Sequence, residues 1–126
     1  MPTVEPHDGI RPAPAAEAEE AYAAVTLVLE GVLLLARTWA LRLDEAVVVA
    51  GLLAMRGAEA PVAVSSLSVL LGMDRATVRR KLSVLDGKGL VSYPKGEGAR
   101  LTASVSEHSG VQKALAGRLR AVSARL

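Results

Sequence analysis

The sequence VSSLSVLLGMDRATVRRKLSVLDGKGLVSYPKGEGARLT, residues 64–102, holds two short helical patterns followed by a hairpin pattern. Apolar residues recur every three or four positions in its first two thirds, as they do along amphipathic helices. The pair Gly72-Met73 separates the two helical patterns and predicts a tight turn, since glycine commonly ends helices. Two short helices, a turn and a hairpin are therefore the starting point for the fold.

The second of these helices has the clearer signals. Asp74 precedes it, and an aspartate at this position accepts hydrogen bonds from the unpaired N–H groups of the first turn. We expect the first helix to run from Val64 or Ser65 to Leu71, and the second from Asp74 to about Asp86. The side chains that the two helices are expected to bury are Leu67, Leu70, Leu71, Val78, Leu82 and Leu85.

A short β-hairpin is predicted after the second helix. Residues 90–93 and 100–102 are short runs suited to strands, and the segment 94–98 between them is rich in proline and glycine. Helix, turn, helix and hairpin in this order are typical of a winged helix-turn-helix. The sequence thus predicts a mainly α-helical fold with a small β-hairpin wing.

The flanking segments complete a single domain. The first helix is apolar nearly all round, so a partner subunit is a natural cover for it. A C-terminal helix is expected to open at Ser104, which forms a capping box with Glu107. The expected parts are a flexible, proline-containing arm over 1–16 and a winged-helix domain over 17–126, made of N-terminal helices (17–41 and 44–56 within 17–56), a core with its wing (62–103) and the C-terminal helix (104–126).

Composition narrows the classes of protein. There is no cysteine, which excludes disulfides and thiolate sites and fits a cytoplasmic protein. The two histidines, His7 and His108, form no metal-site pattern, and no set of catalytic residues is visible, so neither an enzyme nor a cofactor is expected. The apolar run 25–36 contains Glu30 and is shorter than the roughly 20 residues of a membrane span, so no membrane is expected. Glu30 is expected on a water-facing edge of its helix, although a buried sensor is the alternative.

Charge is distributed unevenly along the chain. Residues 1–60 carry nine acidic and four basic residues, whereas residues 74–100 carry seven basic and three acidic ones. A basic second half favours a polyanion-binding face, although a merely solvated charged face is the alternative. Helix 74–86 would enter the major groove and the hairpin would contact the flanking backbone or minor groove. The candidate DNA-binding residues are Arg75, Thr77, Arg79, Arg80, Lys81 and Ser83 on the helix, with Lys95 and Arg100 on the wing.

Residues 64–102 resemble the DNA-binding core of the MarR-type winged-helix regulators. The residues that carry the resemblance are Val64-Ser65-Ser66-Leu67, Leu71-Gly72-Met73, Ala76-Thr77-Val78, Leu85-Asp86-Gly87-Lys88-Gly89-Leu90-Val91 and Leu101-Thr102. The chain departs from the family in the wing, where Gly98-Ala99-Arg100 keeps only the arginine of the family's Asp-x-Arg motif, and in its single C-terminal helix.

The resemblance implies a homodimer held by N- and C-terminal helices, a pseudo-palindromic DNA operator and a small-molecule effector. With the basic helix, it points to a sequence-specific DNA-binding transcriptional regulator whose partner is double-stranded DNA. The alternative is a winged-helix module that binds other proteins without specific DNA binding. Such a module would need no basic face on the second helix.

Overall fold

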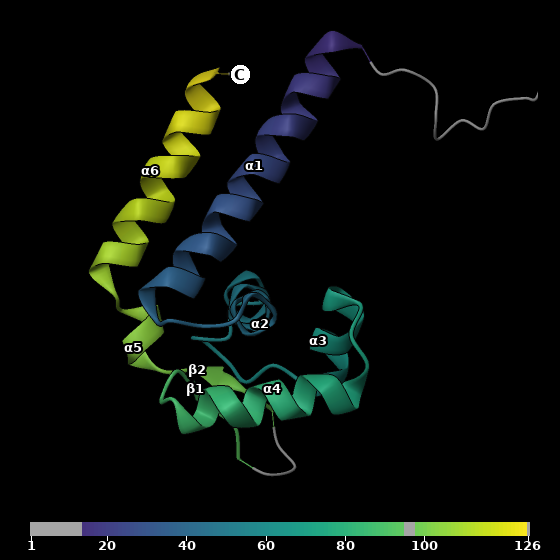
Figure 1. Ribbon diagram of the computed structural model, residues 1–126, viewed down its shortest axis with the longest axis vertical. Helices are drawn as coiled ribbons and strands as arrows, with labels where there is room; N and C mark the ends of the chain where they lie inside the picture. Colours follow the sequence, from purple (N-terminus) through teal and green to yellow (C-terminus); the bar gives the residue numbers. More distant parts are fainter. Residues whose placement is uncertain (1–13, 95–97, 126) are drawn as a thin grey trace, which may run out of the picture.

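The computed structural model describes residues 14–94 and 98–125, and the chain is mainly helical with one small antiparallel hairpin, as predicted (Figure 1). In chain order its elements are α1 (Ala15–Thr38), α2 (Leu43–Ala54), α3 (Val64–Leu71), α4 (Arg75–Gly87), β1 (Val91–Ser92), β2 (Arg100–Leu101), α5 (Ala103–Ser106) and α6 (Ser109–Arg125). Of the predicted arm, residues 1–13 lie outside the described residues, and α1 begins at Ala15, two residues earlier than expected.

A lobe made of α2, α3, α4 and the hairpin contains most of the core. The apolar side chains that this lobe buries completely include Val48, Val49, Leu52, Leu67, Val78, Leu82 and Leu85. The predicted stripe on α4 is therefore confirmed, since its three members lie on successive turns of one helix face. Leu70 was expected to be buried but is half exposed, because α3 has only eight residues and its α2- and α4-facing side is occupied by Leu67 and Leu71.

The hairpin is short and is extended by a segment before α3. Val91 pairs with Leu101 and Ser92 with Arg100. Val62 and Ala99 exchange two backbone hydrogen bonds of 2.8 and 2.9 Å, which ties the entrance of α3 to the returning strand. A Cβ at Gly98 would lie only 3.0 Å from Pro61 Cβ and from the Val62 carbonyl oxygen, so glycine suits the close approach of the two segments.

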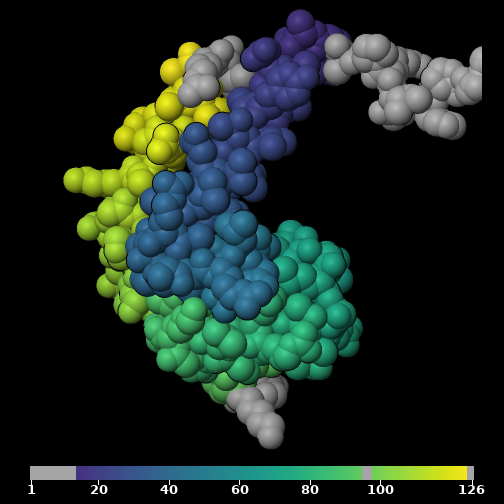
Figure 2. Space-filling model, in the orientation of Figure 1, coloured from purple at the N-terminus to yellow at the C-terminus, as the bar shows by residue number. Residues whose placement is uncertain are grey.

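Helices α1 and α6 lie side by side and form an arm that projects from the lobe (Figure 1). The surface is hollowed between the upper part of α1 and the lobe, which gives this face a C shape (Figure 2). Glu30 of α1 pairs with Arg118 of α6 at 3.5 Å and keeps about 38% of its side-chain surface exposed. Glu30 is thus partly exposed rather than buried, and it joins the two helices of the arm.

The C-terminal helix begins differently from the prediction. The chain forms the single turn α5 at Ala103–Ser106 and a new helix, α6, only from Ser109. The expected Ser104–Glu107 capping box is wrong, since the N–H of Val111 donates instead to Nδ1 of His108 at 3.0 Å. His108 also meets Trp39 edge-on, with ring centroids 5.2 Å apart. This contact fixes the start of α6 against the end of α1.

Helix α1 is apolar over a longer stretch than the run 25–36. It has 24 residues, and its most apolar stretch of 18 has a mean hydropathy of 1.5. By length and composition alone, such a helix could cross a membrane. Only 11% of this stretch is buried inside the structure. The expectation that the chain meets no membrane therefore cannot rest on length and stays a prediction.

Candidate nucleic-acid interface

Helix α4 begins at a cap that the sequence identified correctly. The backbone N–H of Thr77 donates to Oδ1 of Asp74 at 2.8 Å, and the Thr77 hydroxyl donates to Oδ2 at 3.2 Å. These hydrogen bonds from Thr77 hold the pKa of Asp74 below its usual value. The carboxylate therefore stays ionised at neutral pH, where it also suits the positive end of the helix dipole.

One side of α4 is fastened to the start of α2 by two ion pairs. The Lys81 ammonium lies 2.7 Å from Oδ2 of Asp44, and the Lys88 ammonium lies 3.1 Å from Oε1 of Glu45. We call this side, formed by Lys81 and Lys88, the bound flank. Lys81 was a candidate DNA contact, but the structure places its ammonium against Asp44, with 22% of the side chain exposed. Its charge is thus used inside the lobe.

The acids of the bound flank are strongly anchored. The hydrogen bond from Lys81 lowers the pKa of Asp44 below its usual value. Burial raises the pKa of Glu45, but hydrogen bonds from the Arg42 N–H, at 3.1 Å, and from Lys88 more than offset it and leave that pKa lowered. Both carboxylates are therefore charged at neutral pH and hold their lysines.

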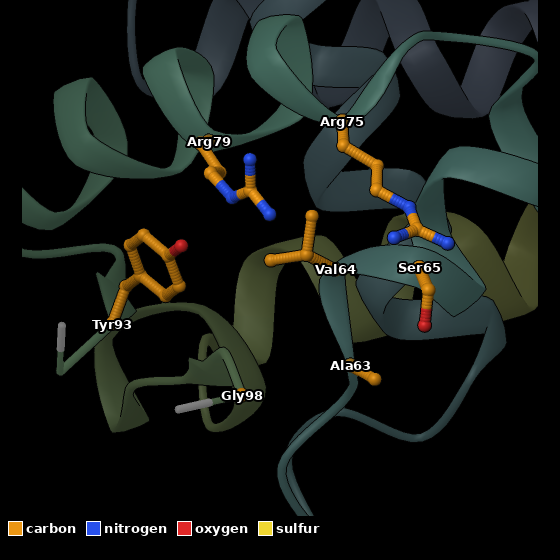
Figure 3. A pocket seen from close by; sticks show the side chains of 7 residues that line it. All are labelled: Ala63, Val64, Ser65, Arg75, Arg79, Tyr93 and Gly98. Carbon is orange, nitrogen blue, oxygen red and sulfur yellow. The ribbon is translucent and has the colours of Figure 1, made fainter. Parts of the chain in front are cut away.

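The opposite side of α4 faces the hairpin across a cavity of about 300 Å³. Arg75 and Arg79 lie four residues apart on this side, which we call the open flank. Figure 3 shows the Arg79 side chain extending toward the space between Tyr93 and Val64, while Arg75 extends toward Ser65. The cavity is lined by Ala63, Val64, Ser65, Arg75, Arg79, Tyr93 and Gly98.

The hairpin side of this cavity is held in place by α4 itself. Oδ2 of Asp86, two helix turns beyond Arg79, accepts the backbone N–H of Tyr93 at 2.9 Å. The distance between helix and hairpin is thereby fixed at one end. The lining is mixed, since Ala63 and Val64 add apolar surface to the two arginines, and the two guanidinium groups give the cavity the means to bind an anion.

The outer face of α4 carries Ala76, Arg80 and Ser83, all exposed. The Arg80 guanidinium donates to the Thr77 hydroxyl at 3.2 Å, and that hydroxyl is in turn held by Asp74. Thr77, a predicted DNA contact, thus serves the cap and orients Arg80. Small side chains at Ala76 and Ser83 leave room for another backbone to approach the helix closely.

The two predicted contacts on the hairpin have different outcomes. Lys95 lies outside the described residues. Arg100 is exposed, but its guanidinium donates to the carbonyl of Glu59 at 2.9 Å. One face of this side chain is therefore used to fasten the hairpin to the loop after α2.

No protein family model matches the chain, and no curated protein and no solved structure is significantly similar to it. Its function must therefore be argued from geometry. Within residues 14–94 and 98–125, no three His, Asp or Glu side chains gather in a way that could hold a metal ion.

A second surface, apolar instead of basic, lies on the arm. A groove of about 520 Å³ between α1 and α2 has no polar lining at all. It is lined by Ala24, Val25, Val28, Leu29, Val32, Leu43 and Val47. Several of these side chains are more than half exposed, which is unusual for large apolar residues that form one contiguous patch.

Sequence reasoning missed Tyr93 and Ser65 as parts of the cavity, and it missed the acids that bind the lysines. Tyr93 carried a usable signal, since it is the single aromatic residue of the hairpin pattern. The sequence also carried a signal that Lys81 lies at the edge of the buried stripe, because it comes three residues after Val78 and four before Leu85. The sequence could not predict Asp44 as the partner of Lys81, since 37 residues separate the two.

Proposed function

We propose that the chain is a sequence-specific DNA-binding transcriptional regulator of the winged helix-turn-helix class that acts as a homodimer. In this proposal α4 is the recognition helix in the major groove. The hairpin is the wing, which lies on the flanking backbone or minor groove. The function is binding without catalysis.

One observation carries the proposal. Arg75, Arg79 and Arg80 stand exposed on α4, and within the described part of the chain none of them pairs with a carboxylate. Both lysines of the same region are paired. Arginines left without counter-ions on one helix favour an anionic partner, because a surface otherwise tends to place opposite charges beside them.

The shape of this region fits the same partner. A helix of 13 residues is about 20 Å long and 10–12 Å across, and the major groove is about 12 Å wide. The order α3, turn, α4 and hairpin, with Val62 bridged to Ala99, agrees with a winged helix. The resemblance of residues 64–102 to the MarR-type regulators supports the same class.

The homodimer is supported by the apolar groove of the arm. A second copy that laid its own α1 against this groove would remove both apolar surfaces from water. A two-fold symmetric dimer would then bind an inverted repeat with half-sites about one helical turn of DNA apart. The small-molecule effector implied by the resemblance stays a prediction.

The dimer is testable with two substitutions on α1. Val28→Glu places a charge in the groove, whereas Thr26→Glu places one on an exposed part of the same helix outside it. Sedimentation at several concentrations should show a dimer for the wild type and Thr26→Glu, and a monomer for Val28→Glu. A wild type that stays monomeric at high micromolar concentration would rule out the dimer.

A second candidate, the protein-binding module, is favoured by an apolar patch on the lobe. Val69 is 84% exposed and lies beside Leu70 and Met55 on a shallow surface. A protein partner could cover these three side chains, whereas DNA would gain little from them.

The deciding experiment is selection from a random double-stranded DNA pool at several salt concentrations, followed by sequencing of the bound fraction. Enrichment of an inverted repeat, with affinity that falls steeply as salt rises, is the result expected of the regulator. Weak binding without an enriched sequence would reject it in favour of the protein-binding module.

A further inference from the structure

We propose that the open flank and the outer face of α4 make different contacts with DNA. This proposal rests on the regulator function proposed above. The cavity of the open flank binds a phosphodiester group of the DNA backbone through Arg75 and Arg79. Arg80, on the outer face, reads a base edge. Affinity and sequence preference therefore reside in different arginines of one helix.

The cavity has the composition of a phosphate site. Two guanidinium groups from consecutive turns of α4 border a space of about 300 Å³, and Ser65 and Tyr93 line it from the other elements. In Figure 3 the Tyr93 hydroxyl points toward Arg79, whereas the Ser65 hydroxyl points away from the arginines. Guanidinium groups bind phosphate oxygens through pairs of parallel hydrogen bonds. Hydroxyl groups are common additional donors to the DNA backbone.

The first turn of α3 adds further donors beside these side chains. Val64 and Ser65, its first two residues, line the cavity. N–H groups in the first turn of a helix have no partner within that helix, and they carry the positive end of its dipole. In this cavity the helix start supplements the two arginines rather than forming a site alone.

The cavity lies between α4 and the hairpin, and this position indicates that its ligand is the DNA backbone. If α4 lies in the major groove and the hairpin over the neighbouring minor groove, the strand that separates the grooves must pass between them. The cavity occupies that interval, since Tyr93 and Gly98 belong to the hairpin side and Arg75 and Arg79 to α4. A phosphate there would be held whatever the base sequence.

Arg80 is placed for a different contact. It follows Arg79 by one residue and therefore points about 100° further round the helix. The chain of hydrogen bonds from Arg80 to Thr77 and from Thr77 to Asp74 orients the guanidinium near the first turns of α4. An oriented guanidinium between small neighbours is suited to the two acceptors of a guanine edge.

The first test compares single substitutions in the DNA selection: Arg79→Ala, Arg80→Ala, and Arg37→Ala on the exposed end of α1 as a matched control. Arg79→Ala should lower the affinity for every sequence by about tenfold or more. It should also flatten the dependence of log affinity on log salt by about one for each lost contact, while the enriched sequence stays the same. Arg80→Ala should remove a preference of about 5- to 150-fold at one position of each half-site. Arg37→Ala should change neither.

A second test needs no DNA. Inorganic phosphate is titrated into the protein while the side-chain Nε–Hε signals of the arginines are followed by NMR. Signals of Arg75 and Arg79 should shift and saturate, and those of Arg80 and Arg37 should move much less. In Arg79→Ala the shift of Arg75 should be weakened.

The outcomes separate the two proposals. A changed sequence preference in Arg79→Ala, or an unchanged one in Arg80→Ala, overturns the division of tasks while the regulator stands. Equal phosphate shifts at Arg37 and Arg79 overturn the cavity as a site. Phosphate shifts confined to the open flank, in a protein that selects no DNA sequence, reject the regulator and assign the cavity to a free anion.

Discussion

The two flanks of α4 carry the same sign of charge and have opposite surroundings. On the bound flank, Lys81 and Lys88 meet Asp44 and Glu45 at 2.7 and 3.1 Å. On the open flank, Arg75 and Arg79 border a cavity and pair with no carboxylate in the described part of the chain. Positive charge alone therefore does not identify a binding surface, and the partner already present in the fold decides what each charge can do.

The choice of residue follows this division. A lysine ammonium is a compact charge on a flexible stem and suits a single carboxylate, whereas the planar guanidinium of arginine presents several donors to phosphates and base edges. The bound flank also fixes the orientation of α4 on α2. The ion pairs of the bound flank therefore also set the direction in which the arginines of the open flank point.

The largest effect, on DNA affinity, is expected from removing two exposed arginine side chains of α4. The double variant Arg79→Ala/Arg80→Ala should lose about 2–6 kcal/mol of binding to the enriched sequence, since two charged contacts are removed. Its thermal midpoint should stay near that of the wild type, because both side chains are exposed. Fluorescence anisotropy and thermal unfolding measure the two quantities. Undiminished affinity in this variant would exclude the arginines as the binding surface.

Breaking the bound flank should act on stability instead. Glu45→Ala removes a carboxylate that is 8% exposed and leaves the Arg42 N–H and the Lys88 ammonium without their acceptor. We expect a loss of about 1–3 kcal/mol in the free energy of unfolding, measured with urea. The control Glu45→Gln keeps the shape and one acceptor oxygen, and it should lose less. If Glu45→Ala is as stable as the wild type, the ion pair does not anchor α4.

Removing the cap of α4 should have a smaller effect, on the melting temperature and on the orientation of Arg80. Asp74→Ala removes the acceptor for the Thr77 N–H and hydroxyl, so the melting temperature should fall by a few degrees. Asp74→Ser restores the first hydrogen bond and should recover most of the loss. A recovery of stability by Asp74→Ser without recovery of DNA preference would show that the Asp74–Thr77–Arg80 chain also orients Arg80. Equal melting temperatures for all three proteins would exclude the cap.

The smallest effect concerns pH. The pKa values of Asp44, Glu45 and Asp74 are all lowered in the folded protein, so the folded state binds fewer protons than the unfolded state in mild acid. Their contribution is complete above the usual values of about 3.8 and 4.5, and it is lost as the pH falls below them. Urea unfolding from pH 7 to pH 3 should show a loss of stability confined to the acid end. The loss should shrink in Glu45→Gln, and a loss of the same size in that variant would place its origin elsewhere.

The lobe was predictable where signals are local. The Asp74 cap, the turn at Gly72 and the stripe of Val78, Leu82 and Leu85 depend on residues within one or two helix turns of each other. Short range is what propensity and periodicity can report. The predicted basic face of α4 was right about exposure for its arginines and wrong about the ammonium of Lys81.

Long-range or unusual contacts account for what the sequence did not predict. The bridge between Val62 and Ala99 is too short to produce an alternating strand pattern. The start of α6 depends on a histidine cap, and Ser104 with Glu107 offered a more familiar pattern in the wrong place. The cavity of the open flank brings together three elements, and such a meeting is a property of the fold rather than of any one segment.

The most direct test of the central claim is to map the DNA contact on the protein by amide NMR shifts, using the sequence enriched in the selection. We expect shifts at the start of α3, along α4 from Arg75 to Ser83 and in the strands of the hairpin, with little change at Val25, Val28 or Val69. Shifts gathered on the apolar groove of α1 or around Val69, with α4 silent, would contradict it.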